Sequence, residues 1–175
     1  MLYVVRHGKT DSNENGRYGG RIDVNLNEEG IRQAEEVALK LKDIKFDKVF
    51  SSPLSRAYKT AEIICKGKYD IIKDERIIER SNGKLEGKLK SEIKEKIDFN
   101  DPNEKRYDIE CITDFRSRIY NFFDEITKKY HDKNILVVTH AGVGIYTRCY
   151  FEGEPEDNDY IKYKLKNCEV LKYNI

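Results

Sequence analysis

In the stretch VVRHGKTDSN, residues 4–13, an apolar strand ends in a cation and an imidazole. Residues 1–5 have the apolar and β-branched side chains of a buried strand, and Arg6 and His7 follow directly. In open α/β sheets, ligands bind beyond the carboxyl ends of the strands. Arg and His also stand at strand ends simply to reach water, so this stretch alone leaves both interpretations open.

Helical and extended patterns alternate along the rest of the chain. Asn27 is placed to cap a helix, and Ser52 followed by Pro53 predicts a cap and the first position of another. The predicted helices cover 28–42, 53–65 and 115–130, and the predicted strands cover 1–5, 46–50, 69–74 and 134–140.

Strands that alternate with helices predict an α/β protein, here a three-layer α/β/α sandwich with a mainly parallel sheet. Residues 160–175 alternate apolar and polar side chains around Lys166-Asn167, which predicts a hairpin at an antiparallel edge of the sheet. Because the chain has 175 residues and no linker or repeat, we expect a single domain over 1–175. The irregular segment 81–110 is expected to form a short helix and loops over one end of the sheet.

Charge and cysteine content exclude several classes of protein. The 33 basic residues balance 32 acidic ones, without a block of like charge, so neither nucleic acid nor a membrane is an expected partner. No apolar run approaches the roughly 18 residues of a membrane span and no signal peptide is recognisable, which predicts a cytoplasmic protein. Cys65, Cys111, Cys149 and Cys168 lack zinc-ligand spacing and are expected to be reduced, small apolar fillers. No metal site and no cofactor are predicted.

Three apolar strands end in cationic or hydrogen-bonding residues. The first leads to Arg6-His7, the second through Ser51-Ser52 to Arg56, and the third to Thr139-His140. Since the carboxyl ends of parallel strands meet at one edge of a sheet, two arginines and two histidines are expected to converge there. Arg56 also falls in the first turn of its helix, where free backbone N–H groups favour an anion. Such a pocket suits a tetrahedral oxyanion such as phosphate.

Four ordered blocks of sequence resemble the histidine phosphatase superfamily, in the branch that includes cofactor-dependent phosphoglycerate mutases and many small-molecule phosphatases. The blocks are RHGKTDSNENGRYGGRIDVNLNEEGIRQA, SSPLSRAYKTAE, IIERSNGKLEG and VVTHAG. An Arg-His-Gly triplet alone is a weak signal, whereas four blocks in the right order are a strong one. The resemblance covers essentially the whole chain and implies a phosphoglycerate mutase-like fold.

The resemblance also implies a role for each residue of the predicted pocket. His7 would be the nucleophile that forms a transient phosphohistidine, and Arg6, Arg56 and His140 would bind the phosphoryl oxygens. Gly8 indicates a turn at the surface of the sheet's end, away from the packed core. Dividing phosphate-ester hydrolysis into two steps through a covalent intermediate makes each step easier.

The resemblance assigns the remaining site residues to acid catalysis and to substrate binding. Glu79 would donate a proton to the leaving oxygen, and Glu86 competes with it for that role. Asn13, Arg17 and Gly20 would bind substrate. The chain departs from the family pattern at position 19, where glycine replaces a common Gln or Thr, and at 109–111; both changes are expected to affect pocket shape more than chemistry.

The favoured interpretation is a metal-independent phosphomonoesterase that acts on a small phosphorylated metabolite through a phosphohistidine on His7. The alternative is a cofactor-dependent phosphoglycerate mutase, whose relatives generally carry a longer insertion than the segment 81–114 found here. Lys105 and Arg106 keep that alternative open as candidate carboxylate contacts. A catalytically inactive phosphate-binding regulatory module is a remote third possibility. The sequence names neither the metabolite nor the oligomeric state.

Overall fold

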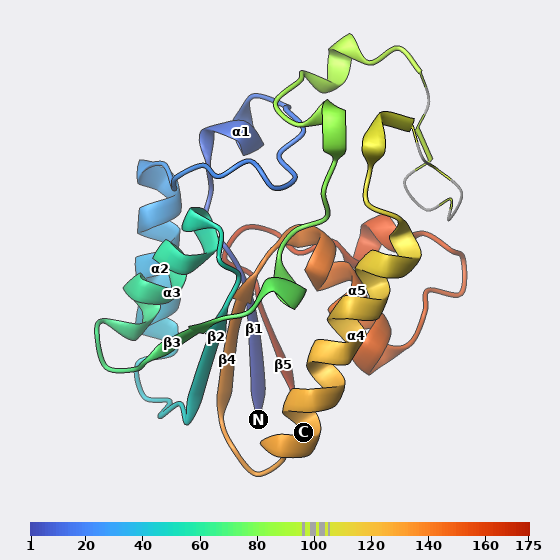
Figure 1. The fold of residues 1–175 in the computed structure, drawn as a ribbon. Helices are drawn as coiled ribbons and strands as arrows, with labels where there is room; N and C mark the ends of the chain where they lie inside the picture. The colour runs from blue at the N-terminus through green and yellow to red at the C-terminus, as the bar shows by residue number, and fades with distance from the viewer. Residues whose placement is uncertain (96, 99–100, 102–103, 105) are drawn as a thin grey trace.

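The computed structural model describes residues 1–95, 97–98, 101, 104 and 106–175 of the chain. Its centre is a five-stranded sheet in the order β3-β2-β4-β1-β5 (Figure 1). The strands are β1 (Leu2–Arg6), β2 (Lys48–Ser51), β3 (Ile71–Lys73), β4 (Ile135–Thr139) and β5 (Val170–Tyr173). The pairings β1–β4, β2–β4 and β2–β3 are parallel, and β5 pairs antiparallel with β1 at one edge. The predicted mainly parallel sheet with an antiparallel edge is confirmed.

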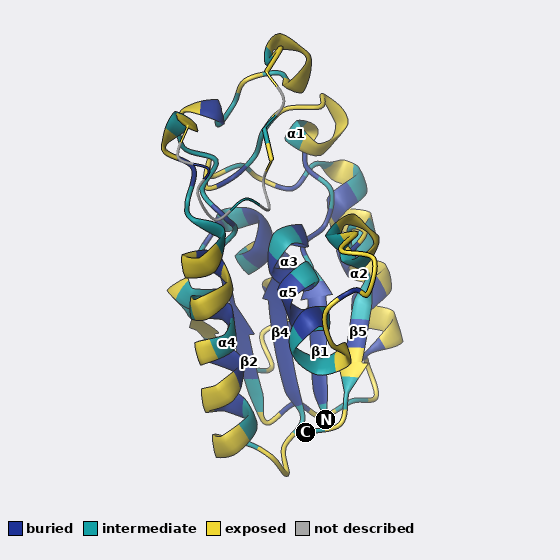
Figure 2. Ribbon diagram, turned by 90° about the vertical axis from the view of Figure 1, so that its right-hand side faces the viewer, coloured by how far each residue is buried: buried dark blue, intermediate teal, exposed yellow. Residues whose placement is uncertain are grey.

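Helices cover both faces of the sheet, which confirms the three-layer sandwich (Figures 1 and 2). α2 (Glu28–Lys40) and α3 (Ser55–Cys65) lie on one face, and α4 (Ile112–Lys129) and α5 (Ala141–Glu152) on the other. Alternate side chains of a strand point to opposite faces, so β1 contributes to both cores. Leu2 and Val4 pack with α4 and α5, whereas Tyr3 and Val5 pack with α2 and α3.

The two predicted helix caps have different outcomes. Asn27 caps α2 as predicted, because its side chain accepts a hydrogen bond from the N–H of Gly30 at 2.9 Å. Ser52 does not cap the next helix, which begins at Ser55 after Leu54. The N–H of Ser52 instead donates to the carbonyl of Val138 at 3.0 Å, so the extended backbone continues beyond β2 and delays the helix.

The C-terminal hairpin prediction is wrong for its first half. Residues 160–163 form a short 3-10 helix, η5 (Tyr160–Tyr163), and β5 finds its partner in β1. The apolar side chains of this segment pack against α5, where Leu165 lies only 1% exposed beside Gly144. α5 itself was not predicted, since it follows β4 after a single residue and its two early glycines lower helix propensity.

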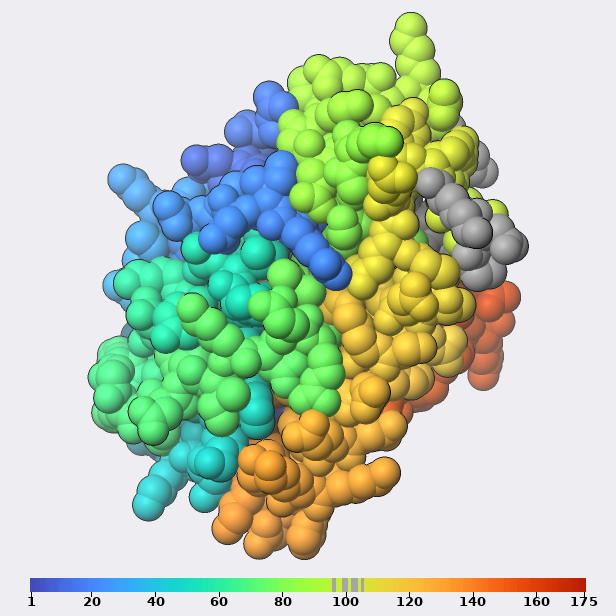
Figure 3. All heavy atoms as spheres, in the orientation of Figure 1, coloured from blue at the N-terminus to red at the C-terminus, as the bar shows by residue number. Residues whose placement is uncertain are grey.

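Two segments far apart in sequence cover the carboxyl end of the sheet (Figures 1 and 3). One contains the short helix α1 (Asp11–Glu14), and the other holds the 3-10 turns η2 (Gly83–Leu85), η3 (Lys90–Glu92) and η4 (Arg106–Asp108). Backbone hydrogen bonds join them, from Tyr18 to Lys88 at 3.0 Å and from Gly87 to Tyr18 at 2.8 Å. The predicted loops over the sheet are present, but the described part of 81–110 contains 3-10 turns in place of one short helix.

The four cysteines are free thiols, as predicted. Cys65 and Cys149 are buried among apolar side chains and fit the expected role of fillers. Cys168 is partly buried and packs against the core on the α2 and α3 side, so the description fits it as well. It is wrong for Cys111, which is partly buried before α4 with its Sγ 3.0 Å from Oγ1 of Thr113. Among the described residues, no helix combines the length and apolar character needed to cross a bilayer.

The turn after β1 is packed against the start of α2, which corrects the expectation of a surface turn at Gly8. A Cβ on Gly8 would lie 2.3 Å from the carbonyl oxygen of Gly30, and one on Gly30 would lie 2.1 Å from the carbonyl oxygen of Lys9. His7 is accordingly only 3% exposed. Close approach of two backbones therefore fixes the strand end against the helix.

Gly30→Ala is expected to lower the free energy of unfolding by about 1–3 kcal/mol, because the added methyl group meets fixed backbone atoms of Lys9. Gly19→Ala is the matched control, since a Cβ there would meet nothing within 4 Å. Urea unfolding of both variants checks the prediction. Equal stabilities would show that the contact between the turn and α2 does not constrain the fold.

Candidate active site

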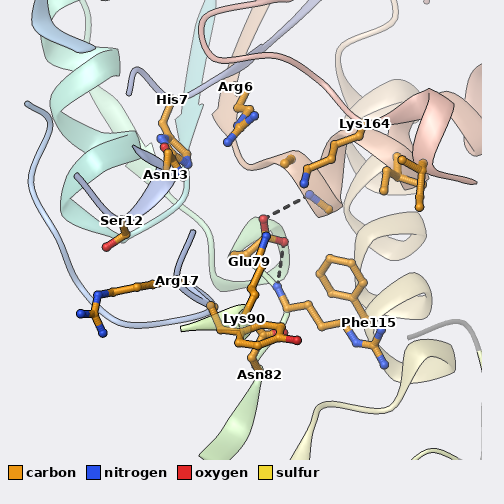
Figure 4. A pocket seen from close by; sticks show the side chains of 18 of the residues that line it. Arg6, His7, Ser12, Asn13, Arg17, Glu79, Asn82, Lys90, Phe115 and Lys164 are labelled. Atoms are coloured by element: carbon orange, nitrogen blue, oxygen red, sulfur yellow. Dashed lines mark hydrogen bonds between the residues drawn. The ribbon is translucent and has the colours of Figure 1, made fainter. Parts of the chain in front are cut away.

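A cavity of about 590 Å³ opens at the carboxyl end of the sheet, beneath the two covering segments (Figure 4). Arg6, His7, Arg56 and Glu79 line it, although they come from three separate parts of the chain. Arg6 ends β1, His7 follows it, and Arg56 lies in the first turn of α3, as predicted. The structure therefore brings together cationic side chains from the carboxyl ends of β1 and β2, which lie on either side of β4.

Backbone hydrogen bonds hold His7 in place and determine which of its ring nitrogens carries the proton. Its N–H donates to the carbonyl of Thr139 at 2.9 Å, which extends the pairing of β1 with β4. Its Nδ1 lies 2.6 Å from the carbonyl oxygen of Gly8. Since a carbonyl only accepts, Nδ1 carries the proton and Nε2 is unprotonated, with a lone pair that can accept. The Nε–H of Arg56 donates to that Nε2 at 3.3 Å.

The surroundings of His7 favour its neutral form. Burial, followed by the positive charges of Arg56 and Arg6, holds the pKa of His7 well below its usual range, and the bond to Gly8 opposes this only in part. Burial is the largest of these causes. A neutral imidazole with a free Nε2 has the protonation state that nucleophilic attack requires.

His140 lies behind His7, with the two ring centroids 5.2 Å apart. Its side chain is fully buried, and its Nε2 lies 2.7 Å from Oγ of Ser52. Its Nδ1 has no hydrogen-bond partner among the described residues. Burial and then the charge of Arg56 lower the pKa of His140 as well. A buried nitrogen without a partner is a place where an oxyanion can supply the missing contact.

Backbone carbonyls fix Arg6 and Arg56, which flank His7 in the cavity. NH1 of Arg6 donates to the carbonyl of Leu165 at 2.7 Å. NH1 and NH2 of Arg56 donate to the carbonyls of Ile22 and Gly20, each at 2.8 Å. Gly20, predicted to bind substrate, thus lines the cavity and anchors Arg56. Its φ of +54° is in the left-handed region that favours glycine.

Glu79 presents its carboxylate to the cavity. Its Oε2 accepts a hydrogen bond from the N–H of Gly142 at 3.1 Å, and its Oε1 accepts one from the N–H of Arg80 at 3.0 Å (Figure 4). Its backbone carbonyl accepts from Arg21 and Arg118, each at 3.2 Å. Both the main chain and the side chain of Glu79 are therefore held in position.

Glu86, the competing acid candidate, has a different place in the structure. It does not line the cavity, and its Oε1 accepts hydrogen bonds from the backbone N–H groups of Arg21 and Asn82, both at 2.9 Å. A Cβ on Gly20 would lie 2.2 Å from the same oxygen. The carboxylate of Glu86 therefore joins the two covering segments, and this placement favours Glu79 as the acid.

A group of residues that no sequence motif indicated supports Glu79 from outside the cavity. The carboxylate of Glu110 accepts from Nε of Arg118 at 2.9 Å, NH2 of Arg21 at 3.1 Å and the N–H of Ser81 at 3.1 Å. The same two arginines donate to the carbonyl of Glu79. Partial burial is the largest influence and opposes ionisation of Glu110, but Arg118, the N–H of Ser81 and the charge of Arg21 together outweigh it and lower the pKa of Glu110. No short sequence motif reveals these bonds, because they join four separate segments.

The predicted substrate-binding residues Asn13 and Arg17 lie at the cavity mouth. Oδ1 of Asn13 accepts from the N–H of Thr10 at 3.2 Å and from Asn167 at 3.3 Å, which leaves its amide N–H groups to donate. Arg17 is exposed, and its NH1 donates to the carbonyl of Gly87 at 2.7 Å. Asn13 is thus close to the cationic side chains, whereas Arg17 joins the covering segments.

The described residues test one further sequence candidate. Arg106 does not line the cavity; it donates hydrogen bonds to the carboxylate of Glu104 and forms an ion pair with Glu95 at 3.6 Å. Lys105, the other candidate for a mutase-type carboxylate contact, lies outside the described residues. Within the described ranges, no group of three or more His, Cys, Asp or Glu side chains is arranged to hold a metal ion.

Comparisons with known proteins agree with this geometry. The family model of the histidine phosphatase superfamily, branch 1, matches residues 2–175. The chain is 35% identical over 148 residues to phosphoserine phosphatase 1 of Hydrogenobacter thermophilus, which covers 80% of this chain and 70% of that protein. Two solved structures are similar. A phosphoserine phosphatase of Entamoeba histolytica has a TM-score of 0.81 and 28% identity, and the alpha-ribazole phosphatase of Shigella flexneri has 0.85 and 25%. Each comparison covers 97% of this chain and 87% of the other.

Protein stability is expected to fall as the pH is lowered, because the buried histidines are neutral in the folded state. Their folded-state pKa values lie below the ordinary value of 6.5, so below that pH the unfolded chain binds more protons than the folded one. The free energy of unfolding should drop by up to about 1.4 kcal/mol per pH unit for each histidine. Urea titrations between about pH 7.5 and about pH 5.5 measure this slope. The variant His140→Gln should show a smaller slope, and an unchanged slope would contradict the assignment.

Proposed function

The chain belongs to branch 1 of the histidine phosphatase superfamily and is a phosphatase of small phosphorylated metabolites; on this premise we propose that it works without a metal, with His7 as nucleophile. The observation that carries the proposal is the lone pair on Nε2 of His7, which faces the guanidinium group of Arg56 in a cavity also lined by Arg6. An uncharged nucleophile beside fixed cations suits attack on a phosphate ester.

In the proposed reaction, Nε2 of His7 attacks phosphorus, a P–N bond forms and the ester P–O bond breaks. Glu79 gives its proton to the leaving oxygen, and the alcohol departs. Water then attacks the phosphohistidine, Glu79 takes a proton from it, and inorganic phosphate leaves with His7 restored. The carboxylate of Glu79 lines the same cavity as His7, which supports a role on the leaving-group side.

Arg6, Arg56 and His140 are proposed to stabilise the charge on the transferred phosphoryl group. Carbonyl contacts fix both arginines before substrate arrives, so little rearrangement accompanies the reaction. His140 does not itself line the cavity, but its ring lies beside His7, and its unpartnered Nδ1 is proposed to contact an oxygen of the phosphoryl group bound there. In other enzymes, removal of one such aimed donor costs about 10²–10³ in rate.

The placement of Arg106 favours hydrolysis over the mutase alternative. A mutase must hold a bisphosphate intermediate while it reorients, and Arg106 is engaged with Glu104 and Glu95 away from the cavity. A binding module without catalysis has no need for a carboxylate placed beside the phosphate site. The single domain over 1–175 and the cytoplasmic location stay predictions.

Glu79→Gln is expected to slow hydrolysis of alkyl phosphates by about 10²–10⁴-fold, because an alkoxide leaves only when it is protonated. Hydrolysis of p-nitrophenyl phosphate should slow much less, since its phenolate leaves without a proton. Steady-state rates on both esters, in excess chelator, measure the difference. The matched control is Glu86→Gln, which should show no dependence on the leaving group. Equal losses on both esters for Glu79→Gln, or a selective loss in Glu86→Gln, would assign the acid elsewhere.

A further inference from the structure

Thr60 is a residue of α3 that the reaction described above does not use. Its side chain is fully buried, and it does not line the cavity. Its hydroxyl nevertheless joins two residues of the site. Oγ1 accepts a hydrogen bond from the N–H of Gly8 at 3.1 Å and donates one to the carbonyl of Arg56 at 2.7 Å. Thr60 therefore links the turn after His7 with the helix that carries Arg56.

These two bonds complete a closed ring of hydrogen bonds around the nucleophile. Nδ1–H of His7 donates to the carbonyl of Gly8 at 2.6 Å, and Nε–H of Arg56 donates to Nε2 of His7 at 3.3 Å. The partners of both imidazole nitrogens are thus joined to each other, and the hydroxyl of Thr60 makes the connection.

The bond to Gly8 distinguishes Thr60 from an ordinary threonine within a helix. Such residues commonly donate their hydroxyl to a carbonyl of the preceding turn. Thr147 in α5 does so, with its Oγ1 2.9 Å from the carbonyl of Val143, and it is equally buried. Among the described residues, no backbone N–H of another element donates to Thr147, whereas Thr60 accepts one from the turn after β1.

Gly8 depends on contacts from other elements because glycine has more conformational freedom than any other residue. Thr60 holds the peptide unit before Gly8. Oε1 of Gln33 holds the unit after it, by accepting from the N–H of Lys9 at 3.0 Å. The carbonyl that keeps the proton on Nδ1 of His7 belongs to this turn, so its direction is set by both contacts.

The link through Thr60 persists when His7 is phosphorylated. Once Nε2 is bonded to phosphorus it has no lone pair left, so the N–H of Arg56 turns from Nε2 to an oxygen of the phosphoryl group. The direct bond between the two side chains is then lost. The new P–N bond leaves the connection through Gly8 and Thr60 unchanged, and this connection keeps the guanidinium group beside the phosphohistidine.

We propose that Thr60 is a positioning residue for phosphoryl transfer, whose hydroxyl holds His7 and Arg56 in their reactive arrangement. This inference rests on the proposed function, because that function gives His7 and Arg56 their roles. Thr60 acts through these residues and does not touch the substrate. Since a small displacement of a reacting group costs up to about 10²-fold in rate, loss of the hydroxyl slows the chemical step.

Two substitutions separate the hydroxyl from the packing of the side chain. Thr60→Val removes the hydroxyl at similar shape, and it should lower kcat/KM for p-nitrophenyl phosphate about 10- to 100-fold. Thr60→Ser keeps the hydroxyl and should restore kcat/KM to within about threefold of the wild type. The matched control is Thr147→Val, which removes the same bond within a buried helix and should cost no more than Thr60→Ser. Equal losses in Thr60→Val and Thr147→Val would contradict the proposal.

The ring nitrogens of His7 give a readout that a loss of stability alone does not change. The chain has three histidines, so their ring-nitrogen NMR signals are few. In the wild type, the chemical shifts of His7 should be those of a neutral ring with its proton on Nδ1. In Thr60→Val they should move toward the average of the two tautomers, and in Thr60→Ser and Thr147→Val they should not. Unchanged His7 signals in Thr60→Val would overturn the proposal, whatever the activity of that variant.

Failure of the inference and failure of the proposed function give different results. If the wild type hydrolyses no ester, the proposed function is wrong, and the signals of His7 alone then judge Thr60. If the wild type hydrolyses p-nitrophenyl phosphate and Thr60→Val equals it, the phosphatase assignment stands and the role of Thr60 is wrong. Should Thr60→Val not fold, Thr60→Cys replaces it with the same expected outcomes, because a thiol is only a weak donor and acceptor.

Discussion

Arg6 and Arg56 place two positive charges beside the buried imidazole of His7, and much of the surrounding structure serves to keep them there. Their guanidinium groups donate to the carbonyls of residues 20 and 22, in the covering segment that contains α1, and of residue 165, in the C-terminal tail. Because burial and these charges disfavour an imidazolium, His7 stays neutral with Nε2 free. The requirement to hold cations next to an uncharged base thus links the sheet, the covering segments and the C-terminal tail.

A second hydrogen-bond network, made of two arginines and a carboxylate, positions Glu79. Arg21 and Arg118 donate to its backbone carbonyl, and the carboxylate of Glu110 binds both arginines. The side chain of Glu79 is held separately by the N–H of Gly142 at the start of α5. Acid, nucleophile and cations are therefore positioned by different elements, and the cavity between them is left for the substrate.

The sequence predicted the layers of the fold and the convergence of Arg6, His7 and Arg56 because both follow from local patterns. Apolar runs identify parallel strands, and the residues that follow such strands meet at one edge of the sheet. The hairpin predicted for the C-terminal tail is wrong for a physical reason. The alternation along residues 160–165 reflects packing on α5, and a sequence pattern does not reveal which strand β5 will join. The prediction of Ser52 as a helix cap is wrong because Ser52, directly after β2, still pairs with β4 in extended conformation.

The supporting residues of the site were harder to predict than the residues that line it. Glu110 and Arg118 act through backbone carbonyls and through partners dozens of residues away, so no local spacing indicates them. Lys164 lies in a stretch whose alternation suggested a strand, which concealed its place in the cavity. The roles of the predicted site residues, including Asn13 and Arg17, remain predictions, whereas their positions are now described.

Trapping of the covalent intermediate tests the central claim most directly. Brief reaction of the protein with a phosphate ester, alkaline denaturation and mass spectrometry of its peptides should place a phosphoryl group on Nε2 of His7. That label should be labile to acid, and His7→Ala should carry none and turn over no substrate. A phosphoryl group found on a serine, or normal turnover by His7→Ala, would contradict the account.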